Sequence, residues 1–242
     1  MINGLSPLST LVRLKVNSNR TSGRCVNCLS RHASHGLCQA CLDDLPANLW
    51  HCYQCALPLP YAAQFRCCGE CQKQPPPFHR SLIPWRYQFP VDGMIGRYKY
   101  QGQRQYARPL LAGLASYLQT ELASNDYPDL LLPAPMHWSR RWRRGFNQAQ
   151  DIAEYLSSEL TTPLSTTLLR RTRRARPQRG LDRTGRLSNL RGSYQVQGKV
   201  PARVAIIDDV VTTGATVRTI ADTLLRAGAE EIQVWALART PG

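Results

Sequence analysis

The stretch from Val204 to Thr216 constrains the fold of this chain most strongly. It begins with a continuous apolar run that ends at Ile207, typical of a strand buried on both faces of a parallel sheet. Asp208 and Asp209 follow, and after them come a turn containing hydroxyls and a glycine and then a segment with helical spacing. Backbone N–H groups and the dipole at a helix start favour an anion, so the pattern predicts a phosphate site. The two acids would lie close enough to hold two vicinal hydroxyls or a hydrated Mg²⁺.

The turn supplies further donors for such a phosphate. Three hydroxyl groups surround a glycine that allows close approach, and the Gly-x₄-Gly-Lys pattern of a Walker loop is absent. Position for position, the segment resembles the ribose-phosphate signature of type I phosphoribosyltransferases. This resemblance implies that Asp208 and Asp209 are the catalytic acids and bind the ribose hydroxyls of phosphoribosyl pyrophosphate (PRPP), together with Mg²⁺. It also implies that the loop holds the 5-phosphate through Thr212, Thr213, Gly214, Ala215 and Thr216. The same family includes regulators that bind PRPP without doing chemistry.

The rest of the chain after residue 80 has an α/β pattern. Apolar runs predict strands over 82–87, 129–133, 204–207 and 232–238, the third of these ending just before the two aspartates. Helical spacing predicts helices over 105–123, 146–160 and 217–225, with Pro109 in a first turn and Gly228 as a C-cap. Strands that alternate with helices predict a parallel sheet flanked by helices. With the phosphate loop, the predicted fold class is α/β of the type I phosphoribosyltransferase kind, preceded by a small cysteine-rich zinc-ribbon module.

That module holds all nine cysteines of the chain, between Cys25 and Cys71. Two Cys-x-x-Cys turns complete a tetrahedral site of four thiolates, which is closed and therefore structural, so four such pairs predict two structural zinc sites. Sequential pairing is favoured over a cross-braced arrangement, and Cys67 is the ninth cysteine, which could replace Cys68. A disulfide cluster, a redox motif and an iron–sulfur cluster are the alternatives. The predicted ligands are Cys25, Cys28, Cys38 and Cys41 for one ion and Cys52, Cys55, Cys68 and Cys71 for the other.

The composition change after the cysteines predicts how the chain is divided. We expect a poorly ordered tail over 1–24, a double zinc ribbon over 25–74, a proline-rich linker over 75–80 and the phosphoribosyltransferase-like domain over 81–242. The first residues have no apolar core of the kind that a signal peptide needs. No apolar run approaches the ~20 residues that cross a bilayer, so we expect a cytoplasmic protein without membrane insertion.

The charge of the chain is +15, and its excess is concentrated between His137 and Arg191, where thirteen arginines face four acids. Arginine is favoured where phosphates are bound bidentately, and Trp138 and Trp142 among the arginines could stack on bases or belong to the core. A solvated basic face is the plainer alternative. In phosphoribosyltransferases the loop after the second strand contacts pyrophosphate, which the resemblance transfers to Arg144. The surplus beyond a few such contacts predicts a polyanionic partner.

Taken in order, the motifs resemble the competence protein F (ComF) family, including its GntX branch. The order is cysteine knuckles, Lys99-Tyr100-Gln101-Gly102, Arg144-Gly145-Phe146-Asn147-Gln148, a pattern from Gln178 to Tyr194, and the Asp208-Asp209 loop. The resemblance implies a cytosolic role in DNA uptake and use, with PRPP or another ribose 5-phosphate ligand, single-stranded DNA and a helicase-type partner. An active Mg²⁺-dependent phosphoribosyltransferase and a PRPP-sensing regulator are the alternatives.

Overall fold

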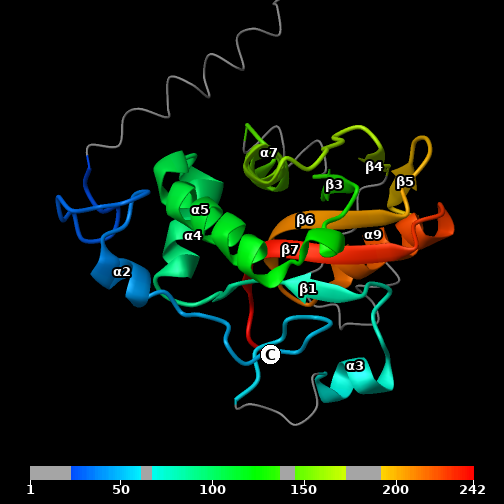
Figure 1. Ribbon diagram of the computed structural model, residues 1–242, viewed down its shortest axis with the longest axis horizontal. Coiled ribbons are helices and arrows are strands. Elements are labelled where there is room, and N and C mark those ends of the chain that lie inside the picture. The colour runs from blue at the N-terminus through cyan, green and yellow to red at the C-terminus, as the bar shows by residue number, and fades with distance from the viewer. Residues whose placement is uncertain (1–22, 61–66, 137–144, 173–191) are drawn as a thin grey trace, which may run out of the picture.

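The computed structural model describes residues 23–60, 67–136, 145–172 and 192–242. At its centre lies a five-stranded parallel sheet in the order β1, β7, β6, β3, and the short β2 also pairs with β7 (Figure 1). Two further strands, β4 (Leu169–Arg171) and β5 (Tyr194–Val196), form a separate antiparallel pair. The strands of the main sheet are β1 (Arg80–Leu82), β2 (Trp85–Arg86), β3 (Leu130–Pro133), β6 (Arg203–Val211) and β7 (Glu231–Arg239).

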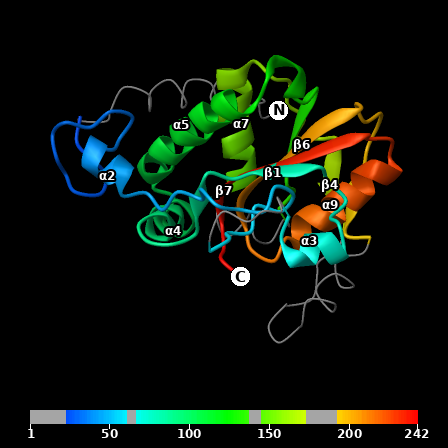
Figure 2. The ribbon, with the colours of Figure 1, turned by 60° about the horizontal axis from the view of Figure 1, so that its bottom comes forward.

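Helices cover both faces of this sheet, which confirms the expected α/β architecture (Figure 2). One core contains Trp235 and Ile207 with the apolar sides of α4, α5 and α7, and the other contains Ile206 and Val234 with α9. Side chains alternate across β6 and β7 in this way because both strands are buried on both faces. The helices are α2 (Gln39–Asp43), α3 (Gly69–Lys73), α4 (Val91–Gln101), α5 (Arg104–Glu121), α7 (Gln148–Leu160) and α9 (Ala215–Arg226), with a 3₁₀ turn η1 (Ser124–Asp126).

Several expected boundaries were wrong. The strand expected to end before the two aspartates runs through them to Val211, because the ladder with β7 continues to the pair Val211↔Arg239 and holds the acids extended. The strand expected over 82–87 is two short strands separated at Pro84, which has no N–H for the ladder. Pro109 lies in the sixth position of α5, beyond the first turn, and packs against Gly36.

The helix between β2 and α5 was missed. Its helical spacing is weak, and Gly93 and Gly96 lower its helix propensity. Tertiary packing compensates, since Val91, Met94 and Ile95 are buried in the first core. The helix ends at Gly102, which adopts the left-handed conformation that a C-cap requires. Lys99, in the last turn of this helix, reaches the carboxyl end of β6.

The cysteine-rich residues 23–45 pack onto the same core as the sheet. Cys25, Leu37, Cys38 and Leu45 belong to the hydrophobic cluster that contains α4 and α5. Further along, the Asn48 amide donates to the Pro84 carbonyl at 2.7 Å. In the part of the chain that the structure describes, no helix combines the length and apolarity needed to cross a membrane.

Gly113 on α5 is expected to tolerate no side chain. A Cβ at this position would lie 2.7 Å from two ring carbons of Trp85, and a buried indole cannot move aside cheaply. We expect Gly113→Ala to lower the free energy of unfolding by about 1–3 kcal/mol, measured by urea denaturation. Gly96→Ala on α4 is the control, because its Cβ would meet nothing within 4 Å and alanine favours helix by up to about 1 kcal/mol. Equal effects of the two changes would contradict this packing argument.

Candidate functional site

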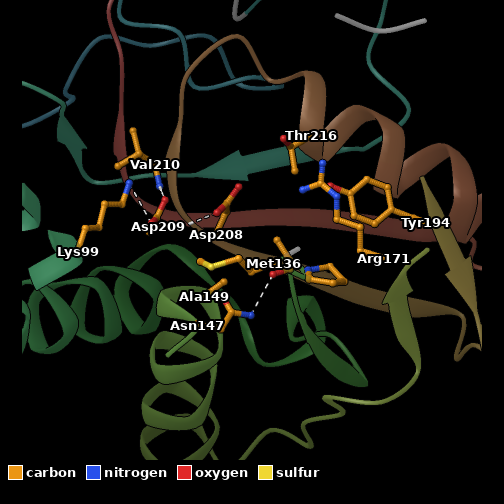
Figure 3. Close-up of a pocket in the computed structure, with 12 residues that line it drawn as sticks. Lys99, Met136, Asn147, Ala149, Arg171, Tyr194, Asp208, Asp209, Val210 and Thr216 are labelled. Atoms are coloured by element: carbon orange, nitrogen blue, oxygen red, sulfur yellow. Dashed lines mark hydrogen bonds and ion pairs between the residues drawn. The ribbon is translucent and has the colours of Figure 1, made fainter. Parts of the chain in front are cut away.

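A pocket of about 200 Å³ lies where the carboxyl ends of β3 and β6 meet the start of α9 (Figure 3). Ligands of parallel α/β sheets bind at this edge because the loops that follow the strands converge there. Positive, negative and hydroxyl side chains face one another across the pocket. Its lining consists of Lys99, Ala134, Pro135, Met136, Asn147, Ala149, Arg171, Tyr194, Asp208, Asp209, Val210 and Thr216.

The two acids lie side by side in this pocket but in different surroundings. The Asp209 amide donates to the Asp208 carboxylate at 2.8 Å, and the Val210 amide donates to that of Asp209 at 2.6 Å. Burial, and after it the negative charge of Asp209, raises the pKa of Asp208 to about 7. The Asp209 amide and the Lys99 ammonium oppose this shift. A carboxyl group that ionises near neutral pH beside a second acid is typical of a functional site.

Lys99 is a site residue that the sequence analysis did not assign. Its ammonium lies 2.9 Å from Asp209 Oδ2, and only 13% of either side chain is exposed. The last turn of α4 places it there, just before the Gly102 cap. The available signal was the Lys99-Tyr100-Gln101-Gly102 motif, which served only as a family marker. One of the two acids of the pocket, Asp209, is therefore paired with a cation from α4.

The predicted phosphate loop reaches the pocket through one of its five residues. Thr216, in the first turn of α9, lines the pocket with the acids. Thr212, Thr213 and Gly214 form the turn that leads to α9, Ala215 is the first residue of that helix, and all four lie outside the pocket lining. Gly214 has φ of +73°, which allows the tight entry into the helix. Arg144, expected to contact pyrophosphate, lies outside the described residues, as do the other arginines of 137–144 and 173–191.

Arg171 and Asn147 complete the pocket. Figure 3 shows Arg171 extending from β4 beside the Tyr194 ring toward Thr216, and its guanidinium carbon lies 5.6 Å from that ring's centre. Its Nε is buried without a hydrogen-bond partner among the described residues. Asn147, from the Arg-Gly-Phe-Asn-Gln motif, donates to the Ala134 carbonyl at 3.2 Å. The Arg171 guanidinium therefore lies on the Thr216 side of the pocket, and the Lys99 ammonium lies on the side of the two acids.

The raised pKa of Asp208 predicts how stability depends on pH. Between the ordinary value of 3.8 and about 7 the folded chain binds a proton that the unfolded chain has lost, so stability falls as the pH rises through this window. We expect wild type to lose about 1–3 kcal/mol more than Asp208→Asn between roughly pH 4 and pH 8, after allowance for partial exposure. Urea denaturation at several pH values measures this. Parallel profiles for the two proteins would contradict the raised pKa.

Two groups of four cysteines lie in the arrangement that the sequential pairing predicted. The first tetrad is Cys25, Cys28, Cys38 and Cys41, and the second is Cys52, Cys55, Cys68 and Cys71. Within each group the sulfur atoms lie within 4.8 Å of one another. Cys67 lies outside both tetrads.

The tetrads fit a tetrahedral metal ion. Four thiolates at about 2.3 Å from one ion lie about 3.8 Å apart. The Cys55 and Cys68 sulfurs are 3.8 Å apart, and those of Cys28 and Cys38 are 3.5 Å apart. A hydrogen bond from the Cys55 side chain lowers the pKa of Cys52 to about 4, against its burial. Each tetrad could therefore hold one metal ion.

Comparison with known proteins identifies relatives that extend over most of the chain. Competence protein F of Haemophilus influenzae is 36% identical over 226 residues, 89% of this chain and 96% of that protein. DNA utilization protein YhgH of Escherichia coli K12 is 34% identical over 208 residues, 85% of this chain and 91% of that protein. Competence protein ComFC of Streptococcus pneumoniae is 27% identical over 163 residues, 66% of this chain and 68% of that protein.

Solved structures and family models contribute little to the family assignment. A purine phosphoribosyltransferase from Pyrococcus horikoshii is 18% identical, with a TM-score of 0.35 over 54% of this chain and 70% of that one. No protein-family model matches the sequence. The identity of more than a third along nearly the full length of the Haemophilus protein decides the assignment, and it agrees with the order of motifs in the sequence. The chain belongs to the competence protein F family.

Proposed function

We propose that this protein takes part in DNA uptake and utilisation in the cytoplasm and binds PRPP, or another ribose 5-phosphate ligand, with Mg²⁺. One observation carries the ligand: Asp208, Asp209 and Thr216, which the sequence assigned to one phosphosugar, line the same pocket. The names of the relatives, competence protein and DNA utilization protein, support the role with DNA.

Different residues of the pocket would bind the two ends of the proposed ligand. Thr216 and the amino end of α9 would hold the 5-phosphate, with the Arg171 guanidinium as a charge-assisted donor. Asp208 and Asp209 would bind the ribose hydroxyls or ligate Mg²⁺ through their oxygens. Asp208 must ionise to do either, so ligand binding should strengthen as the pH rises through about 7. Lys99 would orient the Asp209 carboxylate through their ion pair.

The two tetrads are proposed as structural zinc sites. Four thiolates without an open position favour zinc and leave no place for a catalytic water. Zinc would also supply most of the folding energy of so small a module. The module could then contribute to contacts with a helicase-type partner or with DNA.

Single-stranded DNA is the proposed polyanionic partner of the basic segment between His137 and Arg191. Its net charge of +9 in the sequence is much larger than a pyrophosphate needs. Arginines with aromatic neighbours suit a strand whose phosphates are bound and whose bases are stacked.

An active phosphoribosyltransferase is the second candidate, favoured by the cations at both ends of the acid pocket. Displacement of pyrophosphate needs positioning and charge stabilisation, with no nucleophilic cysteine or serine. A PRPP-sensing regulator is the third, and it requires that ligand and DNA change each other's affinity equally.

Two titrations test the proposal. Calorimetry of the zinc-loaded protein with PRPP and Mg²⁺ should give saturable one-site binding. Fluorescence anisotropy with labelled single-stranded DNA should show affinity falling about 10³-fold or more between 50 and 200 mM salt, if six or more phosphates are contacted. DNA binding that is insensitive to salt contradicts the polyanion part, and absence of any ligand heat contradicts the pocket part. Equal DNA affinity with and without PRPP excludes the regulator.

A further inference from the structure

A buried arginine connects the second cysteine tetrad with the beginning of the phosphate loop. Arg239 stands at the end of β7 and is 7% exposed. Its Nε donates to the Cys55 carbonyl at 3.1 Å, across 184 residues of sequence. Its Nη1 donates to the Val211 carbonyl at 3.1 Å and to the Thr212 carbonyl. One guanidinium thus spans a metal-ligand residue and the turn that precedes α9.

Near the second tetrad, three successive backbone carbonyls accept hydrogen bonds from side chains, two of them from strands of the sheet. Ser81 Oγ of β1 donates to the Gln54 carbonyl at 2.6 Å and Arg239 of β7 donates to that of Cys55, while Asn48 Nδ2, from the loop before the second tetrad, donates to that of Ala56 at 2.9 Å. The three acceptor residues belong to the turn that contains Cys52 and Cys55. The Ala56 backbone amide closes this turn by donating to the Cys52 carbonyl at 2.8 Å. A metal bound to Cys52 and Cys55 would therefore fix the direction of the Cys55 carbonyl.

The end at the loop controls the peptide groups that open the phosphate turn. A peptide unit is planar, so the carbonyl of Val211 and the N–H of Thr212 turn together, as do the carbonyl of Thr212 and the N–H of Thr213. The Val211 carbonyl also accepts from the Thr240 amide at 3.1 Å, so Arg239 matters most for the Thr212 carbonyl and hence for the orientation of the Thr213 N–H. Loss of the acceptor on Cys55 would leave a buried guanidinium partly unsatisfied and free it to shift.

The charges favour the same connection. A zinc ion with four thiolates has two negative charges in excess, and a cation beside it compensates part of them. The first tetrad has different neighbours: Asn27 Nδ2 lies 3.8 Å from Met94 Sδ on α4, and Gly36 packs on Pro109 of α5. Among the described residues, Arg239 contacts the second tetrad and no part of the first.

We propose that the metal of the second tetrad positions the phosphate loop through Arg239, so that metal occupancy and phosphate-ligand binding are energetically coupled. Arg239 is a positioning residue in this scheme, since it lies outside the pocket lining. Filling of the second tetrad strengthens ligand binding, and the bound ligand slows loss of that metal by the same factor, as linkage requires. The identity of the ligand rests on the proposed function, whereas the order of the loop does not.

Three variants of the full chain test this coupling. Cys71→Ser removes one ligand of the second metal without altering the Cys52 and Cys55 side chains, and Cys28→Ser is the matched control at the first tetrad. Arg239→Lys keeps the positive charge but loses the planar guanidinium that bonds the Cys55 carbonyl and the carbonyls of Val211 and Thr212 at the same time. Metal content per chain, hydrogen exchange of the peptide covering 209–216 and calorimetry with PRPP and Mg²⁺ are measured for each. Exchange in β3 serves as the internal reference for global stability.

We expect Cys71→Ser and Arg239→Lys each to speed exchange over 209–216 and to weaken PRPP binding about 10-fold, which is the scale of typical coupling energies. Arg239→Lys should retain both metals. Combining the two changes should weaken binding no further than the stronger single change, since they break the same connection. Cys28→Ser should lose one metal and leave exchange over 209–216 within about twofold of wild type when it is measured relative to exchange in β3, because any loss of global stability affects both segments.

Unchanged exchange over 209–216 after loss of the second metal overturns the coupling, as does an equal effect of Cys28→Ser. If Cys71→Ser fails to fold, Arg239→Lys decides alone, because faster loop exchange with both metals retained supports the connection and unchanged exchange contradicts it. If wild type binds no PRPP, the proposed function fails, and the exchange measurement still decides whether the metal orders the loop.

Discussion

Replacing Asp208 and Asp209 together with asparagine is expected to abolish binding of PRPP with Mg²⁺, lowering the affinity at least about 100-fold. Each carboxylate would give a charge-assisted hydrogen bond or a metal ligand, worth about 1.5–3 kcal/mol. Asparagine keeps the shape but offers no charge to a cation. Calorimetry at pH 8, where Asp208 of the wild type is ionised, gives the clearest contrast.

Asp129→Asn is the control for this change. Asp129 is also an aspartate beside β6, but it pairs with Arg203 at 3.1 Å at the opposite end of that strand. It should leave the affinity for PRPP unchanged. The double variant should remain folded, because removal of the Asp208 carboxyl, whose raised pKa costs stability at neutral pH, offsets part of the loss of the Asp209–Lys99 ion pair. PRPP binding that survives in a folded double variant would exclude the acids as ligands.

The same double variant separates the candidate functions. An enzyme would lose turnover of PRPP, whereas a protein that only binds DNA would keep its affinity for single-stranded DNA. A regulator would keep its DNA affinity in the absence of PRPP and lose the response to PRPP. The measurement is anisotropy with labelled DNA at fixed salt, with and without PRPP.

Removal of metal from both tetrads is expected to unfold residues 25–71 while the sheet remains. Structural zinc contributes about 10–16 kcal/mol in small metal modules, as much as the whole stability of many domains. Around the second tetrad the buried cluster consists of its four cysteines with Leu57, Leu59 and Cys67 at its edge, so the metal is its main source of stability. A strong chelator should make 23–60 and 67–74 sensitive to protease, followed by mass spectrometry.

The sheet should also lose stability, because Leu37 and Leu45 pack into its core. Thermal denaturation before and after chelation should therefore show a lower midpoint for the remaining domain rather than its collapse. Cys67→Ser is the control, since Cys67 lies outside both tetrads and its loss should leave both metals bound. A segment 25–71 that resists protease after complete removal of metal would contradict this expectation.

The predictions that the structure supports come from local patterns. The apolar run of β6, the acids, the turn and α9 are contiguous, so period and turn chemistry were enough to predict them. The cysteine spacing likewise predicted the two tetrads. The predicted ends of the strands were less accurate. Pairing with β7 extends β6 through the two acids, and this pairing cannot be predicted from the residues of either strand alone.

By itself, the sequence determined the α/β class, the pocket's acids, the cysteine sets and the family, since each depends on residues close together or on their order. Only the tertiary structure decided which distant groups join them. Lys99 reaches Asp209 because α4 packs beside the end of β6, and Arg239 reaches both Cys55 and Val211 because β7 ends between them. Such contacts depend on how strands and helices pack, and no periodicity in the chain encodes them.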